Sequence, residues 1–200
     1  MSKSIKEGKL LYHLVPLDSF ESIVQNGLMS RNELQNRGIV FTDTANHEIL
    51  QERERLGLSD YVPFHFHIHT AYDTAVKEHH KDKEFIYMCV ERDYAQANDF
   101  LILPIHPASS QRPELYKYED GFNRIDWETM ELKKGMASDE NYRNLVRMAE
   151  CVTSEIISVN HFKCIFVRND AIKMQLMSIM NELNVPPYSF PNILINEKFF

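Results

Sequence analysis

Short apolar runs, each only five to nine residues long, most constrain the fold of this chain. They are rich in aromatic and branched side chains and are separated by polar segments, which is typical of strands in a partly buried sheet. The runs cover residues 9–16, 61–69, 84–91, 99–105, 155–160, 163–167 and 190–196. We therefore expect a β-sheet built from segments far apart in the sequence.

Helical segments alternate with these runs. A helix over 20–26 could be capped by Asp18 or Ser19 and closed by Gly27, and Asp43 or Thr44 could cap a second helix over 45–56. Residues 141–150 read as a helix that runs into a strand, 168–182 as a further helix, and the Pro-rich stretch 106–124 as a long loop. The pattern predicts an α+β fold, and residues 1–200 are expected to form a single domain.

Composition narrows the class of protein. The hydrophobic content of 44% is ample for a large core, and no apolar run is long enough to cross a bilayer, so we expect a soluble, cytoplasmic protein without membrane association. A monomer is also expected, although the composition does not determine the oligomeric state. Cys89, Cys151 and Cys164 are widely spaced and lie in apolar sequence, which indicates buried thiols. The net charge of −7 argues against a protein that coats duplex DNA, although a narrow nucleic-acid channel stays possible.

The stretch DYVPFHFHIH, residues 60–69, places three histidines at alternate positions. On one continuous strand His65, His67 and His69 would share a face, because successive side chains point to opposite sides. One interpretation is a metal site, and another is a polar strand face. Spacing alone does not distinguish them.

Three ordered segments resemble the DarT family of DNA ADP-ribosyltransferase toxins. The first is LYHLVPLDSFESIVQNGLMS at 11–30, and the second is DYVPFHF at 60–66. The third combines IDWE at 125–128 with RMAECVTSEI at 147–156. The order and separation of these segments agree with the family over most of the chain.

This resemblance implies a fold, a reaction and partners. The fold would be the split mixed β-sheet with flanking helices of ADP-ribosyltransferases. The reaction would transfer ADP-ribose from NAD, as co-substrate, to a base in single-stranded DNA, with no metal required. The partner would be an antitoxin with ADP-ribosyl hydrolase activity of the macrodomain type. Under this reading the 60–69 strand forms a wall of the nucleotide pocket.

The resemblance also assigns roles to individual residues. Glu150 would be the catalytic carboxylate, and Arg53 the active-site arginine, with Arg55 the alternative. The residues expected to contact NAD are Tyr12, His13, Gly27, Tyr61 and Phe64. The chemistry is sensible because a carboxylate stabilises the positive charge that develops on the ribose when the nicotinamide bond breaks.

Each of these residues also has an ordinary interpretation. Glu150 could be an edge glutamate, His13 a core histidine, and Arg53 and Arg55 a solvated helix face paired with glutamates. Gly27 is most simply a helix C-cap.

The 106–147 region would bind the nucleic-acid substrate. It interleaves aromatic and cationic side chains, which suits stacked bases and phosphates, and the candidates are Arg112, Tyr116, Lys117 and Arg124. After Phe66 the chain continues HIHTAYD, where the thymine-modifying branch usually has a Cys-Pro-Arg-Ser-Pro-Met type run. The target base therefore stays open between thymine and guanine, with a lean toward guanine. The alternatives are transfer to RNA or protein, and a non-catalytic metal- or nucleotide-binding module that uses the three histidines.

Overall fold

The computed structural model describes residues 4–44, 47–106 and 114–200. Within them, eight strands form one sheet in the order β5-β4-β6-β2-β1-β3-β7-β8. The strands are β1 Leu10–Pro16, β2 Val62–His65, β3 Phe85–Glu91, β4 Leu101–Leu103, β5 Tyr116–Lys117, β6 Glu150–Thr153, β7 Cys164–Val167 and β8 Asn192–Ile195. The β7–β8 pair is parallel, whereas the other neighbours are antiparallel, so the predicted mixed α+β sheet is confirmed.

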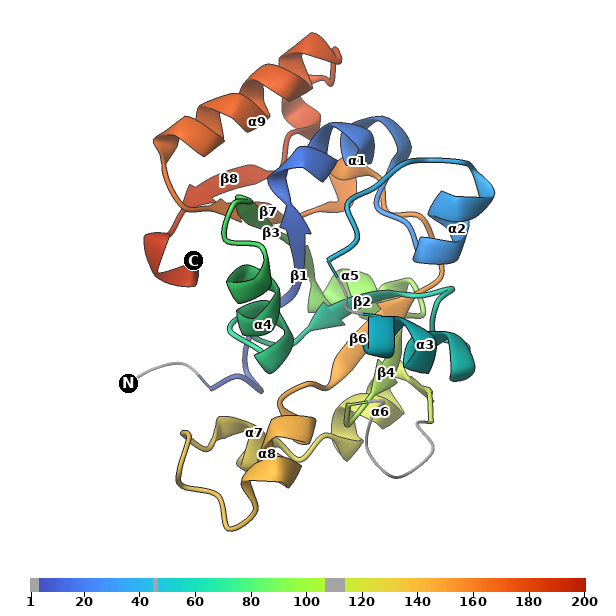
Figure 1. Cartoon of the computed structure of the whole chain (residues 1–200), viewed down its shortest axis with the longest axis vertical. Coiled ribbons are helices and arrows are strands. Elements are labelled where there is room, and N and C mark those ends of the chain that lie inside the picture. Colours follow the sequence, from blue (N-terminus) through green and yellow to red (C-terminus); the bar gives the residue numbers. More distant parts are fainter. Residues whose placement is uncertain (1–3, 45–46, 107–113) are drawn as a thin grey trace.

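The helices surround this sheet (Figure 1). They are α1 Phe20–Asn26, α2 Arg31–Asn36, α3 His47–Arg55, α4 Ala71–His79, α5 Arg92–Ala97, α6 Tyr118–Arg124, α7 Trp127–Glu131, α8 Glu140–Val146 and α9 Asp170–Glu182. Helices α1 and α9 lie beside the β7–β8 end of the sheet, and α6, α7 and α8 gather near β4 at the other end (Figure 1). None of the helices in the described part of the chain is both long and apolar enough to cross a bilayer.

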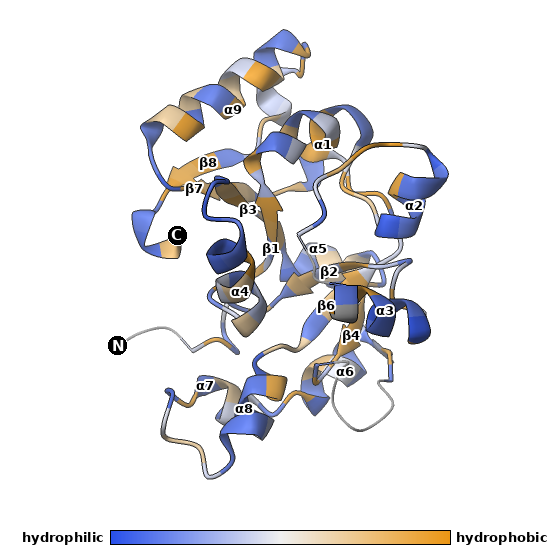
Figure 2. Ribbon diagram, viewed as in Figure 1, coloured by the Kyte–Doolittle hydropathy of each residue, from blue (hydrophilic) through white to orange (hydrophobic). Residues whose placement is uncertain are grey.

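The sheet is covered by apolar side chains that the short runs supply. Strand β3 is buried along almost its whole length, and helix α9 buries Ile172, Leu176 and Met180 at a spacing of four residues. This spacing keeps one apolar stripe of α9 against the core, and hydrophobic and hydrophilic residues alternate along the helix (Figure 2). The core therefore fixes the sheet, and the functional side chains sit where strands and loops leave it. The free thiols Cys89, Cys151 and Cys164 are buried, as expected.

The 61–69 run is not one strand, so the prediction that three histidines share a face is wrong. Strand β2 ends at His65, and His69 adopts a left-handed conformation with φ of 58°. The following Thr70 caps α4 through a reciprocal capping box with Asp73. Because Thr70 must cap α4, the chain leaves the sheet before it reaches His69.

Two further expectations need correction. The 155–160 run forms no strand, because Ile157 makes only an isolated bridge with Leu28 and a 3-10 turn follows. The 106–124 segment is not a continuous loop, since it contains β5 and α6. Helix α6 packs closely on β4, where a Cβ on Gly121 would lie 2.6 Å from the Cβ of Ile102.

Candidate functional site

A cavity of about 730 Å³ opens where strands β1 and β2 separate. The two strands pair at a single position, Tyr12 with His65, so their remaining residues diverge. Residues of α2, α3, α4, the 40–44 segment and the start of β6 complete the wall. This volume lies within the range of about 300–1,000 Å³ that is usual for small-molecule sites.

A buried ion pair stands on the cavity wall. Arg53 Nη1 of α3 lies 2.9 Å from both carboxylate oxygens of Glu150, the first residue of β6. The side chain of Glu150 is 4% exposed and that of Arg53 is 16% exposed. Burial alone would raise the pKa of the Glu150 carboxyl, but the guanidinium of Arg53 and the imidazoles of His65 and His106 outweigh it and lower this pKa. Glu150 is therefore an anion held in place by its partner.

The structure separates the two candidate arginines. Arg53 points to Glu150, whereas Arg55 lies on the outer side of α3 and pairs with Glu52. The two are two positions apart on a helix, so they cannot share a face.

His13 stands on β1 opposite the first residues of β2. Its Nδ1–H donates a hydrogen bond of 2.7 Å to the carbonyl of Pro63, so Nε2 of the neutral ring is left as an acceptor. Burial lowers the pKa of His13 to about 4, so the ring stays neutral near pH 7. The ring also packs against Phe64, with 5.4 Å between the ring centroids. A neutral, oriented acceptor is thus presented on the cavity wall.

The remaining residues predicted to contact the cofactor divide into two groups. Gly27 and Tyr61 line the cavity together with His13. Tyr12 does not line it, because its ring packs against Tyr87 and Phe166 elsewhere on the sheet. Phe64 is fully buried between His13 and Phe100, so it supports the wall from behind.

Three further residues line the cavity; the sequence suggested His65 only as a possible metal or nucleotide ligand, and His106 and Tyr72 not at all. His65 is the cross-strand partner of Glu150, His106 follows β4, and Tyr72 lies on α4. Burial lowers the pKa of His106 and raises that of Tyr72, whose hydroxyl lies 3.1 Å from Thr44 Oγ1. His106 could have been identified from the sequence, because it is a polar residue that directly follows an apolar strand run. Tyr72 carries no comparable signal, because its position depends on how α4 docks.

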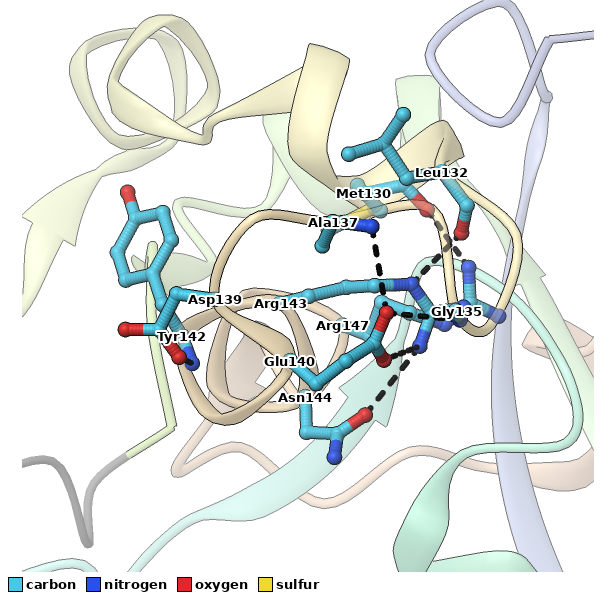
Figure 3. A network of polar contacts seen from close by, with 10 residues as sticks. All are labelled: Met130, Leu132, Gly135, Ala137, Asp139, Glu140, Tyr142, Arg143, Asn144 and Arg147. Atoms are coloured by element: carbon cyan, nitrogen blue, oxygen red, sulfur yellow. Dashed lines mark hydrogen bonds and ion pairs between the residues drawn. The ribbon is translucent and has the colours of Figure 1, made fainter.

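A polar network fixes the segment that leads into Glu150 (Figure 3). Arg143 Nε donates to the carbonyl of Leu132 at 2.8 Å, and Arg147 Nη1 donates to that of Met130 at 2.6 Å. His67 Nε2 in turn donates to the carbonyl of Arg147 at 2.9 Å. These bonds tie α8 to α7 and to the end of β2. They hold the backbone immediately before β6, and so hold Glu150 at the cavity.

Tyr116, Lys117 and Arg124, which were predicted to bind nucleic acid, lie away from the cavity at the edge of the sheet. Lys117 is on β5, two strands beyond β6 and hence about 10 Å across the sheet from it. The guanidinium carbon of Arg124 stands 4.4 Å from the centroid of the Tyr116 ring, and Arg124 and Lys117 are exposed. Arg112 lies outside the described residues.

The three histidines of the 60–69 stretch do not converge. His65 faces the cavity, His67 bonds to α8, and His69 Nε2 donates to the carbonyl of Lys198 at 3.0 Å. Across the ranges that the structure describes, no group of three or more His, Cys, Asp or Glu side chains is arranged to hold a metal ion. The geometry that the metal-site interpretation needs is not present there.

Comparisons with known proteins agree with this architecture. No curated protein matches the sequence at a significant level. The structure resembles Thermus sp. 2.9 DarT in complex with ADP-ribosylated ssDNA, with a TM-score of 0.79, 16% identity and 100% coverage of both chains. It also resembles Thermus sp. 2.9 DarT in complex with NAD+, with a TM-score of 0.74, 15% identity and coverage of 97% of this chain and 98% of that one.

A third solved structure is longer than this chain. Thermosipho africanus DarTG in complex with ADP-ribose matches with a TM-score of 0.70 and 18% identity, over 96% of this chain and 51% of that chain. The family model described as "ssDNA thymidine ADP-ribosyltransferase, DarT" matches residues 12–197. The chain therefore belongs to the DarT family.

Proposed function

We propose that this protein is a cytoplasmic toxin that transfers ADP-ribose from NAD to a base in single-stranded DNA and releases nicotinamide. Membership of the DarT family supports the reaction, and the solved relatives include complexes with NAD+ and with ADP-ribosylated ssDNA. The observation that carries the proposal is the Glu150 carboxylate, buried on the wall of a large cavity and held as an anion by Arg53.

The cavity residues fit a dinucleotide in size and chemistry. The wall is largely apolar, with a few oriented polar groups, as nucleotide sites usually are. His13 offers an acceptor for a hydroxyl or amino group, and Gly27 lines the cavity with its backbone, while the position of an added Cβ faces Ile156 and Ile157. Tyr61 and Tyr72 supply aromatic surface on two sides. These residues, with Arg53 and Glu150, would hold NAD.

The reaction needs stabilisation of positive charge on the ribose next to nicotinamide. When bound, NAD supplies an activated glycosidic bond whose leaving group departs as neutral nicotinamide. Glu150 provides a fixed negative charge in a site sheltered from water, where electrostatic stabilisation is strongest. Arg53 keeps this carboxylate ionised and sets its orientation. One residue thus supplies the charge and the other maintains it.

Single-stranded DNA is the proposed acceptor because the nitrogens of a paired base are engaged inside a duplex. Lys117 and Arg124, beside the ring of Tyr116, would contact the strand at the sheet edge. Thymine is the proposed target base because the family description names thymidine, and guanine is the alternative. An antitoxin that hydrolyses the ADP-ribosyl bond would protect the host.

The test is to incubate the purified protein with labelled NAD and a panel of homopolymeric DNA strands. We expect strong labelling of the thymine strand and much weaker labelling after its complement is annealed. Labelling of the guanine strand alone would overturn the assignment of the base. Equal labelling of single strand and duplex, or labelling only of RNA or protein, would overturn the proposed acceptor.

A further inference from the structure

His65 and Glu150 occupy directly opposite positions on neighbouring strands. The β2–β6 register pairs their Cα atoms, so both side chains project from the same face of the sheet. Cβ atoms of such partners lie about 5 Å apart. Both residues line the cavity. The imidazole is therefore a neighbour of the carboxylate that the proposed reaction requires.

The ring of His65 has a defined orientation and tautomer. Its Nδ1 lies 3.2 Å from the carbonyl oxygen of Ala149, which can only accept, so Nδ1 carries the hydrogen. Among the described residues Nε2 has no hydrogen-bond partner, although the residue as a whole is only 8% exposed. The free exposure of this ring is toward the cavity. His65 thus presents an unoccupied lone pair to whatever binds there.

Glu150 is in the opposite situation. Arg53 Nη1 approaches both of its oxygens at 2.9 Å, so each carboxylate oxygen already accepts from the guanidinium. A carboxylate stabilised in this way is a good electrostatic partner for a cation and a weak proton acceptor. An imidazole is better matched to proton transfer near neutral pH.

We propose that His65 accepts the proton of the target base, while Glu150 stabilises the developing charge on the ribose. The inference rests on the proposed function and deepens it. The base nitrogen forms a bond to the ribose C1′ atom, and the bond from C1′ to nicotinamide breaks, its electron pair leaving with nicotinamide. The N–H proton of the base passes to Nε2 of His65. The resulting imidazolium lies beside the Glu150 anion and then releases the proton to water.

Other ionisable groups lie around His65. They are Glu150 on β6, His13 on β1, His67 after β2, His106 after β4, Tyr72 on α4 and, beyond Glu150, Arg53 on α3.

The test compares His65→Ala with His69→Ala, since His69 comes from the same sequence stretch but is exposed and outside the cavity. Three quantities are measured: the NAD Kd, the rate of NAD hydrolysis by water, and the rate of transfer to a thymine strand. We expect His65→Ala to lower transfer about 100-fold or more, with the NAD Kd nearly unchanged. His69→Ala should match the parent.

Added imidazole provides a readout that a purely structural role would not move. It should restore transfer by His65→Ala, and more basic substituted imidazoles should restore it further. His65→Gln fills the space and keeps an acceptor but cannot take up a proton, so it should be slow and insensitive to imidazole. If His65→Ala does not fold, the transfer rate of the similarly sized His65→Gln protein tests the proposal instead.

Transfer by either variant at the parent rate would overturn the proposal, as would a folded His65→Ala protein that imidazole cannot restore. Failure of the proposed function is distinguishable, because then the parent protein itself would label no DNA strand. If the parent labels DNA and the His65 variants do so at the same rate, the proposed function stands and only the proposed role of His65 is wrong.

Discussion

The Arg53–Glu150 pair allows activity to be separated from stability by removing one charge or both. Glu150→Ala leaves the guanidinium of Arg53 in a mostly buried position without its carboxylate. Arg53→Ala leaves a carboxylate that is 4% exposed without its cation. The double change Arg53→Met with Glu150→Leu removes both charges and keeps apolar volume at the site.

The magnitude follows from the burial of each partner. Breaking a buried pair by removing one member costs about 3–5 kcal/mol. Glu150→Ala should lie at the lower end, about 3 kcal/mol, because 16% of the Arg53 side chain reaches solvent. For a domain of this size each kcal/mol shifts Tm by about 2–4 °C, so the expected decrease is roughly 6–12 °C. The double variant should melt above either single variant, since no unpaired charge remains.

The pH dependence of Arg53→Ala gives a second measurement. In the parent protein the pKa of the Glu150 carboxyl is lowered, because Arg53, with His65 and His106, outweighs the burial that raises it. A lowered folded pKa contributes stability that is present above the unfolded pKa of about 4 and is lost as the pH falls. Arg53→Ala removes the guanidinium and with it much of this contribution, so the stability deficit of the variant should grow as the pH rises from about 4.

The assay combines thermal unfolding with transfer of labelled ADP-ribose to single-stranded DNA. All three variants should lose at least about 100-fold in transfer rate, because each removes the charge at the ribose or its partner. Glu155→Ala is the matched control, since this carboxylate is exposed and outside the cavity, and it should behave like the parent. A Glu150→Ala protein that melts with the parent, or that labels DNA at the parent rate, would refute the reasoning.

Three further predictions concern the wall and the sheet edge. Gly27→Ala should destabilise the protein by about 2–4 kcal/mol in urea unfolding, because Gly27 has φ of 83° and an added Cβ would lie 2.5 Å from Ile156 Cγ2. The parent should lose stability as the pH falls from about 6.5 to 4, because the pKa of His13 is lowered to about 4 and its stabilising contribution is complete only above the unfolded pKa. In His13→Asn this pH-dependent loss of stability should be smaller. Changing Lys117 and Arg124 together to Ala should weaken binding of single-stranded DNA, measured by fluorescence anisotropy, and leave the NAD Kd unchanged.

Matched variants give these predictions their controls. Gly57→Ala has a similar positive φ of 69° but nothing within 4 Å of an added Cβ, so it should cost only about 1–2 kcal/mol. Equal costs at the two glycines would contradict the steric argument. The control for the DNA-binding prediction is to change Arg168 and Lys173, at the β7–α9 side, to Ala. This change removes the same total charge as the Lys117 and Arg124 variant. Equal weakening of DNA binding by both pairs would show a general charge effect instead of a contact at the edge.

The sheet could be predicted from the sequence where burial sets the pattern. Strands β1 and β3 pair over seven positions, and both follow apolar runs that the sequence shows directly. The prediction failed where a local turn overrode the run. The alternation of FHFHIH continues past His65, but strand β2 ends there and Thr70 already caps the next helix, α4. Apolar periodicity carries no information about such a capping requirement.

The site was predictable only in part because it depends on contacts between distant segments. Glu150 and His13 were identified through motif resemblance, and the structure places both at the cavity. The choice between Arg53 and Arg55 depends on how α3 is rotated about its axis. Residues two positions apart on a helix point to different sides, so only one of the two arginines can reach Glu150. Tyr12 was expected beside His13 in the site, but its ring packs against Tyr87 and Phe166 and does not line the cavity, which the sequence does not show.

A buried ion pair such as Arg53–Glu150 adds little net stability to a fold, so stability alone does not explain this pair. Well-packed apolar side chains at both positions would stabilise the fold as well or better, because desolvation of two charges offsets much of their attraction. The pair also lies on the wall of a cavity, where it supports little packing. Its geometry instead keeps a carboxylate ionised, oriented and shielded from water beside an unoccupied imidazole nitrogen. A charge and a proton acceptor on two side chains, in register across two strands, are what glycosyl transfer to a base nitrogen requires and what stability alone does not.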